Sequence, residues 1–179
     1  ISPLCFPKSY NALKKKDQNE ADYWDSCVVS TVHGIFASIL GIYVFYTDEN
    51  IIKDGYHYES PLAHLCIYII TGYLFSDLLL CLTHPKWPGL GMLLFHHVLG
   101  IICMFHSLTM GYGSGLVIPC VIVEATAPFV NGRWFLDKIG WRSSTLYIIN
   151  GAMITILWFL LRIVFMGWFL FQYVYVKWV

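Results

Sequence analysis

The fold of this chain is decided by one apolar stretch, Gly91-Met-Leu-Leu-Phe-His96-His97-Val-Leu-Gly100-Ile-Ile-Cys-Met-Phe-His106. With the residues that follow, it is long enough for a helix to cross the hydrocarbon of a bilayer, which takes about 20 residues. Two adjacent histidines lie about a turn and a half inside one end. Ionisable side chains are costly in lipid, so they tend to face a protein interior or a wet cavity and to mark function. The stretch therefore predicts both a membrane helix and a site.

The composition of the whole chain is typical of a protein that crosses a membrane several times. Of its 179 residues, 58% are hydrophobic and only 12% are charged, whereas about 25% of the residues in soluble domains are charged. Eleven basic and eleven acidic side chains balance each other, so the chain offers no basic surface for nucleic acid. The six cysteines show no metal-ligand spacing, and we expect neither a metal nor a cofactor.

Apolar segments predict an all-α integral membrane protein, a bundle of five to six transmembrane helices. Residues 1–26 form a polar flank, and residues 27–179 form the membrane domain. The expected spans are residues 27–46, 62–82, 91–110, 116–135 and 144–165, with a further apolar segment at 166–179. The run that begins at residue 144 is too long for one crossing. We expect a span that ends near Arg162, followed by a re-entrant or interfacial segment or by part of a sixth span.

Small residues and prolines indicate how two of these spans pack. Ser30, Gly34 and Ser38 recur every four residues in the first span, a spacing that lets another helix approach closely. Pro119 and Pro128 interrupt the fourth span, where proline removes a backbone donor and kinks a helix. We expect a close contact of the first span and a bend in the fourth.

The distribution of lysine and arginine predicts the orientation of the bundle. With five crossings, residues 1–26, 83–90 and 132–143 lie on one side and carry eight of the eleven basic side chains. Cytoplasmic segments of membrane proteins hold the excess of these residues. The N-terminal flank is therefore predicted to be cytosolic.

Titratable side chains of four predicted helices lie in the cytosolic half of the membrane. At 1.5 Å per residue, His33, Asp77, His96 and His97 lie about 8–9 Å from the cytosolic ends of their spans and Glu124 about 16 Å. Adjacent residues point about 100° apart on a helix, so the two histidines of the pair cannot face one point. We expect one to reach a cavity and the other to bond a neighbouring helix.

Two interpretations of these buried groups compete. Histidine can act as a general base or nucleophile near neutral pH, and a cavity inside lipid would admit an amphipathic substrate. The structural alternative is that such groups hydrogen-bond across helices. For His33 alone we favour the structural role, and for His97, Asp77 and Glu124 together a functional site. Arg162 is expected to snorkel or to contact a lipid headgroup.

Five short motifs carry a resemblance to a known family. They read VSTVH (residues 29–33), TGYLFSDL (71–78), FHH (95–97), VEATAPFVNGRWF (123–135) and ING (149–151). In this order and spacing, residues 24 to about 165 resemble the TLC domain of the ceramide synthases. They are most similar to the small TLC-domain-containing membrane proteins. The resemblance implies that the chain lacks a leading span and at least one closing span, so that the domain is truncated at both ends.

The resemblance also implies a site and a setting. Ceramide synthases use a histidine pair followed by two acidic residues three apart; here Glu124 matches the first of these and Ala127 stands at the second. Catalytic positions are then His96, His97, Glu124 and Asp77, and lipid- or substrate-binding positions are His33, Asn131 and Arg133. The expected location is the endoplasmic reticulum or a related endomembrane, with membrane lipids as partners.

These observations leave three hypotheses for function. The leading one is a protein of lipid homeostasis that binds or handles lipid in a cavity open to the cytosolic side and influences membrane lipid composition. The alternative is a ceramide-synthase-like N-acyltransferase that uses acyl-CoA and a sphingoid base, with His96 or His97 as base or acyl carrier. A receptor for cargo or protein partners is favoured least, because the loops are short while the buried groups converge.

Overall fold

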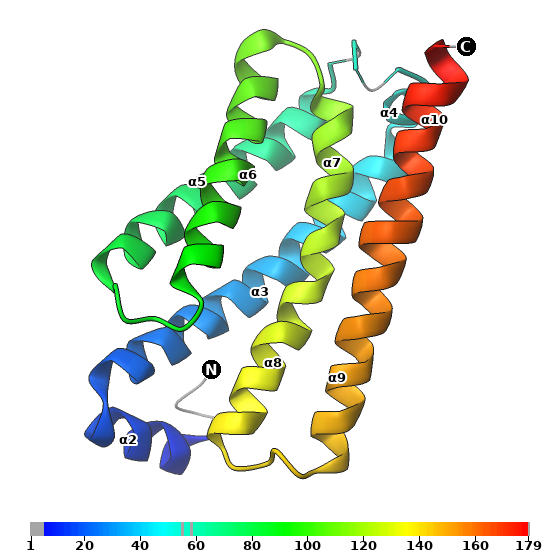
Figure 1. Ribbon diagram of the computed structural model, residues 1–179. Helices are drawn as coiled ribbons and strands as arrows, with labels where there is room; N and C mark the ends of the chain where they lie inside the picture. Colours follow the sequence, from blue (N-terminus) through cyan, green and yellow to red (C-terminus); the bar gives the residue numbers. More distant parts are fainter. Residues whose placement is uncertain (1–5, 55, 58, 179) are drawn as a thin grey trace.

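The computed structural model describes residues 6–54, 56–57 and 59–178, and in these residues it contains helices and no strand (Figure 1). In chain order the elements are α2 (Pro7–Lys16), α3 (Gln18–Thr47), α4 (Glu49–Asp54), α5 (Pro61–Thr83), α6 (Leu90–Met110), α7 (Ser114–Ile122), the 3₁₀ turn η1 (Val123–Thr126), α8 (Ala127–Lys138), α9 (Thr145–Trp158), the π-helical turn η2 (Phe159–Phe165) and α10 (Met166–Trp178). The predicted all-α architecture is confirmed.

Five helical segments of the described residues are long and apolar enough to cross a membrane: Gln18–Thr47, Pro61–Thr83, Leu90–Met110, Ser114–Lys138 and Thr145–Gln172. The second and third agree with the predicted spans to within one residue at each end. The first begins earlier than predicted, because the side chain of Asp17 accepts a hydrogen bond from the backbone N–H of Asn19 and caps the helix there. The helix therefore extends beyond its apolar part into the polar flank.

The last membrane helix differs from the expectation. Instead of ending near Arg162, it continues from α9 through η2 into α10 without a break. The π-helical turn takes up an extra residue while the backbone hydrogen bonds continue, and a tilted helix can exceed the length of a perpendicular span. Residues 166–178 are thus the continuation of the fifth helix and not a separate segment.

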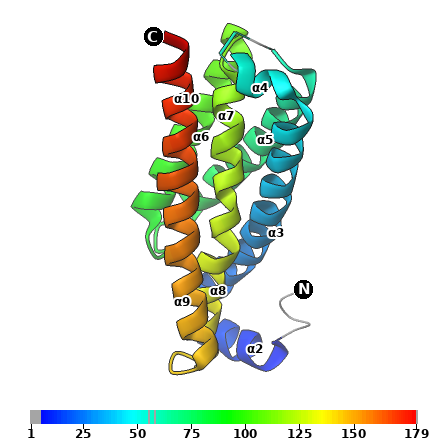
Figure 2. The same cartoon turned by 90° about the vertical axis from the view of Figure 1, so that its right-hand side faces the viewer.

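The fourth membrane segment is interrupted where the prolines predict. Pro119 lies inside α7, the chain narrows to the 3₁₀ turn η1, and Pro128 occupies the first turn of α8. α7 and α8 run between α3 on one side and α9–α10 on the other (Figure 2). The interruption places Glu124 in the 3₁₀ turn, in the middle of the bundle.

The small-residue face of α3 allows a close contact with this interrupted helix. A Cβ atom added at Gly34 would lie 2.9 Å from the Cβ of Ala127 and 3.0 Å from the carbonyl oxygen of Glu124. One added at Gly41 would lie 3.1 Å from Ile122. The predicted close approach is therefore present, and it fixes η1 against α3.

Candidate functional site: a polar cavity inside the bundle

A cavity of about 200 Å³ lies where α3, α5, α6, η1, α8 and η2 meet, within the membrane-length helices. Polar side chains from all of these elements line it: Ser26, Ser30, His33, Tyr73, Asp77, His96, His97, Glu124, Asn131 and Arg162. The structure thus brings together every predicted site residue except Arg133. The cavity also includes residues that were not predicted as site residues.

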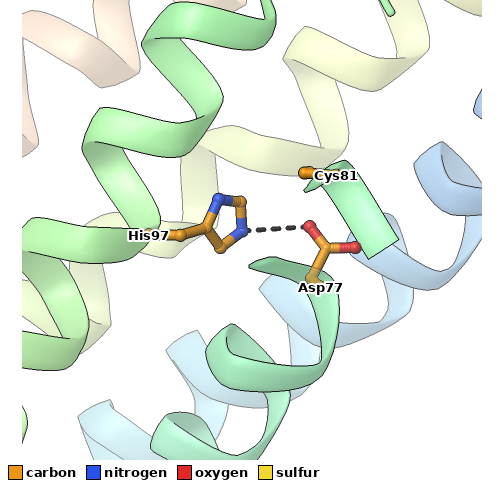
Figure 3. A group of neighbouring side chains, drawn as sticks. All are labelled: Asp77, Cys81 and His97. Carbon is orange, nitrogen blue, oxygen red and sulfur yellow. Dashed lines mark ion pairs between the residues drawn. The ribbon is translucent and has the colours of Figure 1, made fainter. Parts of the chain in front are cut away.

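His97 and Asp77 form the buried part of this cavity. His97 comes from α6 and Asp77 from α5, and the two side chains point toward each other (Figure 3), with 3.0 Å between Nε2 and Oδ2. The Nδ1 atom of His97 lies 2.7 Å from the carbonyl oxygen of Leu93, and Ser26 donates to Oδ1 of Asp77 at 3.5 Å. Both side chains are less than a tenth exposed. The pair is therefore buried and bonded to neighbouring groups of the protein.

The hydrogen-bond pattern restricts what His97 can do. Its Nδ1 must donate to the Leu93 carbonyl, which only accepts. A proton must then lie between Nε2 and the Asp77 carboxylate, whichever of the two atoms carries it. Neither ring nitrogen has a free lone pair for a substrate proton. This arrangement favours a structural role for His97, while its predicted catalytic role stays a prediction.

His96 and Glu124 form a looser pair at the same cavity. The Nε2 atom of His96 lies 3.5 Å from Oε1 of Glu124, which is longer than a good hydrogen bond. The His96 side chain is 48% exposed, against 7% for His97, and no hydrogen bond within the described residues engages its ring. As predicted from the 100° step, one histidine bonds a neighbouring helix while the other stays accessible. His96 is the one available to a ligand.

Two further predicted residues, His33 and Asn131, also line the cavity and differ in their contacts. The ring of His33 stacks on Tyr73 at 3.5 Å between centroids, and it lines the cavity. Asn131 also lines the cavity, but its amide donates to the Cys27 carbonyl and the Thr31 hydroxyl, both at 3.1 Å, and so joins α8 to α3.

Arg133 lies outside the cavity. Its guanidinium packs over the ring of Tyr147 at 4.0 Å and donates to the Tyr147 carbonyl at 3.4 Å. Both contacts join α8 to α9. The predicted lipid contact of Arg133 is therefore not part of this site, because the side chain is occupied by the next helix.

Asp77, Cys81 and His97 are placed so that they can hold a metal ion. Each offers one buried donor atom, and the three atoms lie within 4.8 Å of one another (Figure 3). Zinc accepts this combination of oxygen, sulfur and nitrogen ligands, and the bond from His97 to Leu93 is of the kind that orients a metal-binding histidine. A proton shared between His97 and Asp77 satisfies the same atoms, and the absence of a metal remains a prediction.

Sequence reasoning missed Arg162, Tyr73 and Cys81 as parts of this region. Arg162 carried a signal, since a charged residue inside an apolar run is by default a functional candidate. Its position beyond the centre of the last span favoured snorkelling or a contact with a lipid headgroup instead of a place in the site. Tyr73 lies in the motif TGYLFSDL, which carried the family resemblance but no site role for this residue, and Cys81 carried no signal, because thiols are common in any membrane helix.

Comparison with known proteins identifies the family. The model of the TLC domain family matches residues 23–179. The chain belongs to the TLC domain family. It is 32% identical to TLC domain-containing protein 4 of Homo sapiens over 155 residues, which are 86% of this chain and 58% of that protein. It is 30% identical to TLC domain-containing protein 4-B of Danio rerio over 169 residues, 93% of this chain and 63% of that protein.

The TLC family places the chain among integral membrane proteins, generally tied to lipid metabolism. The chain spans about three-fifths of the length of these curated relatives. No solved structure matches it significantly.

Proposed function

We propose that this TLC-domain protein binds or handles membrane lipid in its cavity and thereby influences membrane lipid composition. One observation carries the proposal: a polar cavity of about 200 Å³ within a membrane bundle. A cavity needs only about 10–15 Å³ on this measure to hold one water, so this one has room for a polar headgroup. The helix surfaces around it are rich in exposed apolar side chains, which suits chains that remain in the bilayer.

We further propose that the cavity serves the cytosolic leaflet of the endoplasmic reticulum or a related endomembrane. The connection between α5 and α6 approaches the start of α3, where His84 lies 3.6 Å from Asp22. Lys138 at the end of α8 forms an ion pair with Glu20 nearby. The basic segments therefore share one end of the bundle, and the positive-inside rule assigns that end to the cytosol.

Lipid that stays with the purified protein tests the proposal. Protein in neutral-detergent micelles is analysed by native mass spectrometry and lipid extraction, and wild type is compared with His96→Ala. His106→Ala is the matched control, because His106 is exposed on the same helix and outside the cavity. We expect a defined lipid class with wild type and His106→Ala and several-fold less with His96→Ala. Wild type without a defined lipid contradicts the proposal.

The second candidate is an N-acyltransferase, which the accessible His96–Glu124 pair supports. In this reaction the nitrogen of a sphingoid base attacks the thioester carbonyl of acyl-CoA. His96 takes a proton from the amine, the carbon–sulfur bond breaks, and the thiolate leaves with a proton. Glu124 stabilises the charged imidazole, and His97 holds its helix in register with Asp77.

Mass spectrometry distinguishes this candidate. Purified protein in nanodiscs is incubated with a long-chain acyl-CoA and sphinganine, and the N-acylated product is measured for wild type and His96→Ala. Product formed by wild type and lost in the variant identifies an enzyme. No product from folded wild type that retains lipid leaves lipid handling as the function.

A further inference from the structure

Arg162 is a charged side chain in the last membrane helix. It belongs to neither of the two histidine–carboxylate pairs. It lies in the π-helical turn η2 and lines the same cavity as His96 and Glu124. π-Helical turns are rare and occur frequently at functional sites. In this helix the turn coincides with the residue that reaches the cavity.

The charge of Arg162 has no counter-ion in the described part of the chain. A guanidinium is always protonated and carries five donors, yet no carboxylate oxygen lies within 4.0 Å of it. Glu124, an acidic residue of the same cavity lining, pairs with His96 instead. Arg133 differs, because an aromatic ring and a carbonyl oxygen occupy it. An uncompensated cation is expensive in a membrane, and an anion from outside the chain would remove this cost.

His33 supplies a second unmet polar group in the same cavity. Its ring is fixed by stacking on Tyr73. Its Nε2 atom is buried and has no hydrogen-bond partner among the described residues. A buried polar atom without a partner costs about 1–3 kcal/mol, and a ligand that bonds it removes this cost. The cavity thus presents a free cation and a free imidazole nitrogen.

We propose that Arg162 anchors the anionic headgroup of an amphiphile, a carboxylate or a phosphate, and that His33 gives the same ligand a hydrogen bond. The planar guanidinium matches two oxygens of either group at once. The proposal rests on the lipid-handling function above and adds that the headgroup of the bound lipid is anionic. A carboxylate points to a free fatty acid, and a phosphate to a phosphorylated lipid.

A series of probes with one chain length tests the proposal. Hexadecanoate, hexadecyl phosphate and the neutral methyl ester of hexadecanoate are titrated into the protein in neutral-detergent micelles, and bound probe is counted by native mass spectrometry. We expect wild type to bind at least one anionic probe about tenfold more tightly than the ester, the size of a charge-assisted hydrogen bond. The stronger of the two anionic probes identifies the headgroup.

Three variants locate the preference. Arg162→Gln is expected to bind the anionic probes no better than the ester, and Arg162→Lys to keep part of the preference. Arg142→Gln removes an exposed arginine outside the cavity and should leave it unchanged. Equal binding of all three probes by wild type overturns the inference, and this outcome does not depend on whether Arg162→Gln folds. A preference for the anionic probes that survives in folded Arg162→Gln overturns it as well. In both cases bound probe leaves lipid handling intact, whereas wild type that binds no probe and retains no lipid contradicts both proposals.

Discussion

The two histidine–carboxylate pairs of this TLC domain have nearly the same composition and different surroundings. His97 and Asp77 are buried, 3.0 Å apart, and bonded to Leu93 and Ser26 as well. His96 and Glu124 are 3.5 Å apart, and half of the histidine is exposed. Neighbouring positions on one helix thus give one imidazole a fixed structural environment and the other an open one.

Burial and the number of satisfied hydrogen bonds therefore decide the role of a histidine in this fold. A pair in which every acceptor is matched resists change and stabilises the bundle. A pair with a long contact and a free ring nitrogen can exchange its partner for a ligand. Stability and ligand binding should therefore respond to different substitutions at one cavity.

The largest loss of stability is expected for Asp77→Ala. It leaves His97 buried without the group that shares its proton, and breaking a buried ion pair from one side costs about 3 kcal/mol or more. Glu124→Ala should cost about 1 kcal/mol or less, as for a partly exposed pair. SDS titration of both variants in the same detergent measures the free energy of unfolding. Equal losses would remove the distinction between the pairs.

A smaller loss of stability is expected for Gly34→Ala, which displaces the backbone that carries Glu124 of the His96–Glu124 pair. The added Cβ lies 2.9 Å from Ala127 and 3.0 Å from the Glu124 carbonyl oxygen, so η1 must shift. Overpacking of this kind costs about 1–3 kcal/mol. Gly72→Ala is the control, because a Cβ at Gly72 meets nothing within 4 Å. If SDS titration gives the two variants the same stability, the close contact of α3 with η1 is not rigid.

The sequence predicts the membrane helices well, because apolar runs mark the spans that lie in hydrocarbon. It misses the polar extension of α3 from Gln18, where a cap and not apolarity sets the start. It also misses the π-helical turn at Arg162, since the extra residue leaves no mark in an apolar run. The two histidines and the two carboxylates that line the cavity were predicted as site residues, but their pairing was not. Which carboxylate meets which histidine depends on helix rotation, which depth along a span does not give.

Tyr10→Phe tests a third carboxylate contact, at the end of the bundle and away from the cavity. Tyr10 donates to Oδ2 of Asp25 at 2.7 Å, and one such hydrogen bond contributes about 1 kcal/mol. This bond, with burial, raises the pKa of Tyr10 to about 12. The contact therefore stabilises the fold fully below the unfolded pKa of about 10 and loses its effect as the pH rises through the folded value.

The cost of Tyr10→Phe in SDS titration should accordingly be the same at pH 7 and pH 9, with retained lipid unchanged. Loss of lipid in this variant would mean that the cavity depends on the end of the bundle, and the contrast between the two histidine pairs would no longer be local.

The smallest change in stability is expected for Glu124→Gln, which keeps the shape of the side chain and removes its charge. The contact with His96 is long and partly exposed, so the free energy of unfolding should change by about 0.5 kcal/mol.

The main effect of Glu124→Gln should instead be on the lipid that the protein retains. Without the carboxylate, His96 loses its partner on η1, and the cavity lining loses one negative charge. Retained lipid should change several-fold in amount or class, measured by lipid extraction. Glu49→Gln is the matched control, since Glu49 pairs with Lys53 on an exposed helix outside the membrane segments. A Glu124→Gln protein with the lipid content of wild type would make both pairs structural, and the function would then have to be sought at Arg162.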